Sequence, residues 1–182
     1  MLRGRAIIVL SAAFAIFASG TLGLGTTAAD GATGTYSVAR AVSLEDLLLG
    51  EINVLRSAHG LRPFAASTDL ARAAVGHSRS MAVGGFFAHE SQNGAAFWQR
   101  VRRFYVPRSA SWMVGENLAM FGGVAPSANA IVAAWMSSPP HRANLLQGVF
   151  REAGIGIIHN PSAGGVFGGR PTWIITLDFG RR

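Results

Sequence analysis

Three polar residues stand out because their chemical types could work together: His89, Glu116 and His141. Glu116 lies in residues 113–121, whose pattern predicts a strand, and there it shares a face with Leu118 and other apolar residues. An unpartnered buried charge is costly, so we expect this carboxylate to be paired or ligated. His89 follows two phenylalanines in an expected loop and His141 follows two prolines, both places where a scaffold presents functional side chains.

Histidine and carboxylate together suit two kinds of chemistry, holding Zn²⁺ and acid–base work near neutral pH. The sequence therefore predicts His89, Glu116 and His141 as candidate metal ligands, with Glu116 also a candidate catalytic base. A structural network of buried histidine and glutamate explains the same residues equally well. The chain has no Gly-x-Ser-x-Gly motif and no phosphate-binding loop of the Walker type. Its lack of cysteine excludes thiol nucleophiles, thiolate metal sites and disulfides.

Apolar spacing and capping residues indicate the elements that position these side chains. Ser43 with Asp46 predicts the start of a helix, and Gly60 its end. Helices are expected over residues 43–60, 67–84 and 95–104, from residue 126 to the Pro139-Pro140 segment, and over 141–146, and strands over 113–121, 153–159 and 172–179. Helices first and strands last favour an α+β fold, in which helices cover an antiparallel sheet.

The chain divides into a leader (residues 1–29), a linker (30–42) and one domain (43–182). The leader has two arginines, then an apolar stretch, and ends in Thr27-Ala28-Ala29, the pattern of a cleavable signal peptide. The alternative is an uncleaved anchor, because residues 6–24 are almost long enough to span a bilayer. We therefore expect a secreted or periplasmic protein, or one attached to the membrane by this segment.

Arginine supplies all sixteen basic residues, and the formal net charge is +7. Genome composition or selection for an acidic partner would explain this, and the spread of the arginines along the chain favours genome composition. The densest run is Arg100, Arg102, Arg103 and Arg108, which predicts either a solvated helix face or contact with an anionic polymer. No specific nucleic-acid site is indicated.

A series of motifs, in order along the chain, resembles the bacterial CAP family, which groups cysteine-rich secretory proteins, antigen 5 and pathogenesis-related proteins. The resemblance runs from about Leu44 to Gly180. Its motifs are Ile52-Asn53 with Arg56, Gly60-Leu61-Arg62-Pro63, His77-Ser78-x-x-Met81, Phe86-Phe87-Ala88-His89, Gly115-Glu116-Asn117-Leu118-Ala119, Trp135-Met136-x-Ser138-Pro139-x-His141-Arg142-x-Asn144-Leu145-Leu146, Phe150-x-Glu152-x-Gly154-Ile155-Gly156 and Trp173 to Gly180.

This resemblance implies an α-β-α sandwich with a cleft lined by two histidines and acidic residues. His89, Glu116 and His141 fall on family positions. Eukaryotic members carry a second glutamate where this chain has Ser138, so the four-residue cleft is incomplete. The family is secreted and functionally diverse.

We therefore expect an exported CAP-domain protein that acts mainly by binding. One form of this hypothesis has the site hold a divalent metal such as Zn²⁺. One alternative is a zinc-dependent hydrolase of the cell envelope or extracellular space, in which Glu116 activates water. Another is a structural envelope protein that binds anionic polymer. The missing nucleophile and second glutamate favour binding over hydrolysis.

Overall fold

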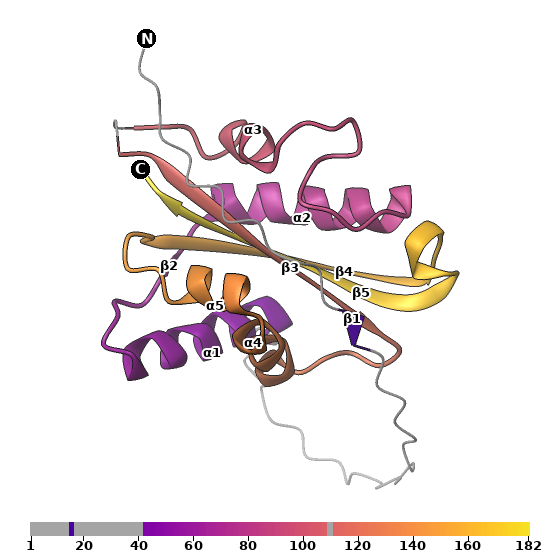
Figure 1. Cartoon of the computed structure of the whole chain (residues 1–182), viewed down its shortest axis with the longest axis horizontal. Coiled ribbons are helices and arrows are strands. Elements are labelled where there is room, and N and C mark those ends of the chain that lie inside the picture. The colour runs from indigo at the N-terminus through magenta and orange to yellow at the C-terminus, as the bar shows by residue number, and fades with distance from the viewer. Residues whose placement is uncertain (1–14, 17–41, 109–110) are drawn as a thin grey trace, which may run out of the picture.

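The computed structural model describes residues 15–16, 42–108 and 111–182. Helices lie on both faces of a single sheet, with α2 and α3 on one side and α1, α4 and α5 on the other (Figure 1). The helices are α1 (Leu44–Ala58), α2 (Thr68–Gly84), α3 (Phe97–Arg102), α4 (Ala128–Ser137) and α5 (Pro139–Leu145), with a short 3-10 helix, η1 (Gly165–Phe167). Within the described part, no helix is both long enough and apolar enough to span a bilayer.

The sheet is built on three long strands with a two-residue strand at each edge. The strands are β1 (Ala15–Ile16), β2 (Ala65–Ala66), β3 (Met113–Gly122), β4 (Glu152–Ala163) and β5 (Arg170–Arg181), in the spatial order β1-β3-β5-β4-β2. The central strand, β5, is antiparallel to β3 and β4, whereas β1 and β2 pair in parallel with β3 and β4. β1 belongs to the predicted leader, and the rest of residues 1–41 lies outside the described residues.

Serine caps explain where three of the helices begin. Ser43 and Asp46 form a reciprocal capping box at α1, with the Asp46 amide donating to Ser43 Oγ at 3.1 Å. Ser67 and Ser127 accept in the same way from the third residue of α2 and α4. α2 ends at Gly85, whose φ of 67° is the left-handed conformation that glycine adopts without strain.

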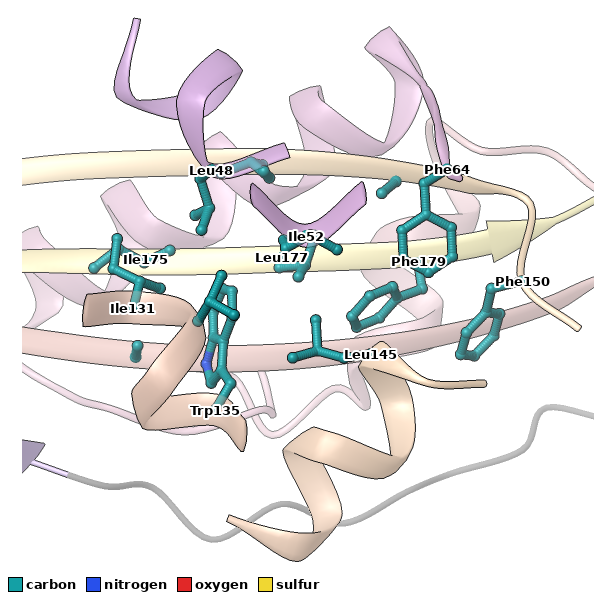
Figure 2. Packing of buried hydrophobic residues seen from close by; sticks show 14 of the residues in the cluster. Leu48, Ile52, Phe64, Ile131, Trp135, Leu145, Phe150, Ile175, Leu177 and Phe179 are labelled. Carbon is teal, nitrogen blue, oxygen red and sulfur yellow. The ribbon is translucent and has the colours of Figure 1, made fainter. Parts of the chain in front are cut away.

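The strands alternate their side chains between the two helical layers, and both layers are apolar. Toward α1, α4 and α5, Trp135 packs with Ile131, Ile175 and Leu177 in the largest buried cluster (Figure 2). The layer toward α2 and α3 contains two smaller buried clusters, which include Leu70, Val101, Val114, Met81, Leu118 and Ile174. β5 is therefore buried on both faces.

Two glycines allow α2 to lie directly against β4. A Cβ at Gly154 would lie 2.1 Å from the backbone nitrogen of Ala71, and one at Gly156 would lie 2.2 Å from that of Val75. Across this contact the Ser78 hydroxyl donates to the Gly156 carbonyl at 2.9 Å. The close approach places the residues of α2 beside β5, where the polar groups of the candidate site gather.

The predicted α+β fold, with helices covering a largely antiparallel sheet, is confirmed. The third helix is shorter than expected, since only residues 97–102 are helical. The last helix begins two residues earlier than expected, at Pro139, because proline fits the first turn of a helix. The two final strands are longer than expected, because their pairing extends into the glycine-rich connector.

Candidate functional site

The three predicted site residues come from three different elements. His89 lies in the loop after α2, Glu116 lies in the middle of β3, and His141 lies in the first turn of α5. Glu116 points to the α2–α3 side of the sheet, since its neighbour Gly115 abuts Phe150 of the opposite cluster. The Glu116 side chain is 1% exposed, and His141 is likewise 1% exposed.

His89 and Glu116 are brought together as a hydrogen-bonded pair. His89 Nδ1 lies 2.8 Å from Glu116 Oε1, so Nδ1 carries the hydrogen and donates it to the carboxylate. This bond fixes the tautomer and the orientation of the imidazole ring, as a carboxylate partner commonly does for functional histidines.

Arg100 is the cation of this site, a role that its place in the basic run did not reveal. Its guanidinium donates to Glu116 Oε2 and also lies 3.3 Å from the His89 carbonyl oxygen and 3.2 Å from Ser91 Oγ. Each oxygen of the Glu116 carboxylate therefore has its own donor. The other arginines of the run are exposed: Arg102, Arg103 and Arg108.

These contacts decide the charge of Glu116. Burial alone raises the pKa of the carboxyl, because a charge is poorly solvated there. The hydrogen bond from His89 and the charge of Arg100 outweigh this effect and lower the pKa of Glu116 below its ordinary value. Glu116 is therefore an ionised carboxylate whose negative charge is balanced by Arg100.

A second carboxyl, Asp178 of β5, lies directly opposite Glu116 in the β3–β5 register. Asp178 is fully buried, and neither of its oxygens has a hydrogen bond of ordinary geometry. Burial, followed by the negative charge of Glu116, raises the pKa of Asp178 well above its usual range. Burial and the charge of Glu116 therefore both favour the neutral, protonated form of Asp178. The sequence showed it only as one residue in an alternating strand.

His77 is a core histidine on the buried face of α2. It is 1% exposed, and its Nε2 donates to the Ala88 carbonyl at 2.8 Å, which fastens the residue before His89 to α2. Burial lowers the pKa of His77 to about 4, despite the opposing effect of Glu116. His77 is therefore neutral at physiological pH and positions the loop that carries His89.

His141 is held by its backbone and leaves its ring without a protein partner. Asn117 donates to the His141 carbonyl at 3.0 Å, and Asn144 donates to the Glu116 carbonyl at 3.2 Å and to Asn117 Oδ1 at 2.9 Å. Neither ring nitrogen of His141 has a hydrogen-bond partner. Burial, and then the nearby His89 imidazole, lowers the pKa of His141 to about 4. The two asparagines thus tie α5 to β3.

The geometry bears on how a metal would be held. Across the described residues, no group of three or more histidine, aspartate and glutamate side chains is arranged to hold a metal ion. Each Glu116 oxygen already accepts one hydrogen bond, from His89 or from Arg100, so Glu116 would bind a metal only through a remaining lone pair. The unpartnered ring nitrogens of His141 are the donor atoms that suit a metal best. Metal binding by His89, Glu116 and His141 stays a prediction.

One further residue, Ser138, and a surface pocket lie near His141 without taking part in this network. Ser138, which stands where eukaryotic CAP proteins carry glutamate, is buried at the start of α5 and supplies no carboxylate. The exposed side of α5 helps to form a separate surface pocket of about 400 Å³, which is lined by Met136, Ser137, Pro139, Arg142, Ala143 and Leu146.

Comparison with known proteins places this arrangement in a family. Residues 49–179, most of the chain, match the profile of the CAP, or cysteine-rich secretory protein, family. Two Bacillus subtilis proteins are similar: the membrane protein YlbC, 30% identical over 113 residues (62% of this chain, 31% of YlbC), and YkwD, 29% identical over 129 residues (70% and 48%). The chain thus spans about a third to a half of these relatives.

Among solved structures, an extracellular protein of Bacillus anthracis that contains an SCP domain is similar in fold. It is 27% identical with a TM-score of 0.55, over 76% of this chain and 40% of that protein. The family motifs, the sandwich and the family profile agree, and we conclude that this chain belongs to the CAP family of cysteine-rich secretory proteins.

Proposed function

We propose that this protein is exported from the cell and acts by binding at the site of His89, Glu116 and His141. Export is supported by the signal-like pattern of residues 1–29 and by the extracellular description of the similar Bacillus anthracis protein. The proposed location is the periplasm or the medium. Attachment to the membrane through an uncleaved N-terminal segment is the alternative.

The observation that carries the proposal of binding is the engaged state of the Glu116 carboxylate. A general base needs an accessible oxygen and a pKa near the working pH. Glu116 has one oxygen against His89 and the other against Arg100, and its pKa is lowered. The carboxylate therefore orients His89 and balances Arg100, which are tasks of a binding site.

His141 supplies the part of the site that a ligand would contact. A neutral imidazole offers one donor and one acceptor, and neither has a partner among the described residues. A buried polar group without a partner costs stability, so a ligand that satisfies these nitrogens recovers free energy. A divalent cation or a ligand rich in hydroxyl groups would suit them.

Zinc titration of the full chain tests the metal form of this proposal. We expect one Zn²⁺ per chain for wild type, loss of this binding in His141→Ala, and no change in His159→Ala. His159 is a matched control, because it is exposed and stacks on Trp173 at a ring distance of 4.5 Å. Equal binding by all three proteins, or by none, would assign the histidines to a structural network.

A zinc-dependent hydrolase is the second candidate, favoured by the His89–Glu116 pair, since a carboxylate commonly orients metal-binding histidines. A screen of peptides, esters and cell-wall glycans with added Zn²⁺ separates the two functions. We expect no turnover. Metal-stimulated turnover by wild type, abolished in a Glu116→Gln protein that is still folded, would show that the site is catalytic.

A further inference from the structure

The segment after α3 exposes arginines and apolar side chains together. We infer that residues 102–108, here named the basic loop, dock on the surface of an anionic lipid membrane. Arg102, Arg103 and Arg108 are exposed, and between them Phe104 is 41% and Val106 56% exposed. The basic loop does not include the three site residues, so this inference goes beyond the proposed function.

Tyr105 holds the basic loop in place and forces its neighbours outward. The Tyr105 ring is completely buried, and its hydroxyl donates to Glu152 of β4. The Trp112 indole donates to the Tyr105 carbonyl at 3.0 Å, and the Arg182 guanidinium lies 4.3 Å from the centre of the Tyr105 ring. The side chains on either side of Tyr105 therefore face solvent on a fixed support.

Among the residues that the structure describes, no acidic side chain is paired with the arginines of the basic loop. The sequence has no aspartate or glutamate between Glu90 and Glu116. The nearby acids of other elements are already engaged by Arg182, which lies 2.8 Å from Asp69 and 3.6 Å from Glu152. Within the described part, Arg102, Arg103 and Arg108 form no ion pair. The loop thus presents a net positive charge to its partner.

The exposed apolar side chains distinguish a membrane from other anionic partners. A phosphate-rich polymer would use the arginines but would leave Phe104 and Val106 in water. A bilayer interface accepts both, because headgroups attract arginine while aromatic and aliphatic side chains enter the acyl boundary. A second copy of this chain is a poor partner, since two basic loops would repel each other.

The absence of cysteine allows a local test in the full chain. A single cysteine at Phe104→Cys, labelled with an environment-sensitive fluorophore, reports whether the loop enters an apolar phase. Val83→Cys is the matched control, because Val83 is 82% exposed on α2 and has the exposed Arg79 nearby in sequence. We expect a blue shift at position 104, but not at 83, on vesicles of phosphatidylglycerol and phosphatidylcholine, and none on phosphatidylcholine alone.

Charge variants complete the test. In the labelled Phe104→Cys protein, Arg102→Gln and Arg103→Gln should each weaken the vesicle affinity about fivefold, whereas Arg79→Gln should leave it unchanged. Soluble polyphosphate should cause no blue shift at position 104. Equal shifts at positions 83 and 104, or no shift on anionic vesicles, would overturn the inference. Binding to polyphosphate alone would also overturn it and would assign the arginines to an anionic polymer.

Discussion

Replacing Glu116 by glutamine removes the negative charge of the site while nearly preserving the shape of the side chain. Glutamine can still accept a hydrogen bond from His89 or from Arg100, but its amide group then faces the other donor. Arg100, which is largely buried, keeps the His89 carbonyl and Ser91 but loses its counter-ion. One charge-assisted hydrogen bond is lost outright, and a buried cation is left unbalanced.

We expect Glu116→Gln to lower the free energy of unfolding by about 2 to 3 kcal/mol at pH 7. This figure lies below the cost of breaking a fully buried ion pair for two reasons. Arg100 retains partial access to solvent, and removal of the Glu116 charge also removes its repulsion of Asp178. Asp178 is then free to ionise and to compensate Arg100 in part.

Asp178→Asn is the matched control, because Asp178 faces Glu116 in the same register pair. A protonated carboxyl and an amide have similar shapes and are both neutral, so we expect this change to cost less than about 1 kcal/mol. The asymmetry between two adjacent carboxyls tests the charge assignment directly.

Urea unfolding of wild type, Glu116→Gln, Asp178→Asn and the double variant measures both effects and their coupling. The contribution of the Glu116 charge to the free energy of unfolding is fully present above the pKa that the carboxyl has in the unfolded chain. It is lost as the pH falls through the lower pKa that Glu116 has in the folded protein. The difference between wild type and Glu116→Gln should therefore shrink in acid. Equal costs for the two single variants at pH 7, or a larger cost for Asp178→Asn, would refute the reasoning.

Three further outcomes are expected from the structure and a fourth from the sequence. The free energy of unfolding should fall by on the order of 3 kcal/mol, from His77 alone, as the pH drops from 6.5 toward 4. The reason is that the unfolded histidine takes up a proton over this range and the folded one does not. Urea unfolding measured across this pH range tests the expectation, and a flat profile would contradict it. Gly156→Ala should lower the free energy of unfolding by at least about 3 kcal/mol, because the added Cβ would clash with the α2 backbone. Gly76→Ala should change it little, since no heavy atom lies within 4 Å of a Cβ at Gly76. Asn144→Ala should cost about 2 to 4 kcal/mol in thermal unfolding, since it leaves two buried acceptors unpaired; a cost under 1 kcal/mol would contradict this. N-terminal sequencing of protein from the envelope or medium should begin near Asp30, and an intact Met1 would favour the anchor.

Local signals along the chain determined the elements. The capping box at Ser43, the caps at Ser67 and Ser127 and the left-handed Gly85 depend on contacts within a few residues, so they can be recognised without the fold. The expectation that Glu116 needs a partner also came from the sequence, since a carboxylate on an apolar strand face is expensive wherever the strand lies. The place of His89 in a loop after two phenylalanines marked it as a candidate from the sequence, and in the structure its Nδ1 lies 2.8 Å from Glu116 Oε1.

Only the tertiary structure decided which groups complete the site. In the sequence, Arg100 belongs to a basic run with Arg102 and Arg103. In the structure, the orientation of α3 points Arg100 toward Glu116, whereas Arg102 and Arg103 face solvent. The pKa of Asp178 is raised because strand register sets it opposite Glu116 and because helices cover both faces of β5. Apolar alternation cannot predict either result, since register and burial on both faces depend on partners far away in the chain. The charge of each group in this site is therefore a property of the packed layers.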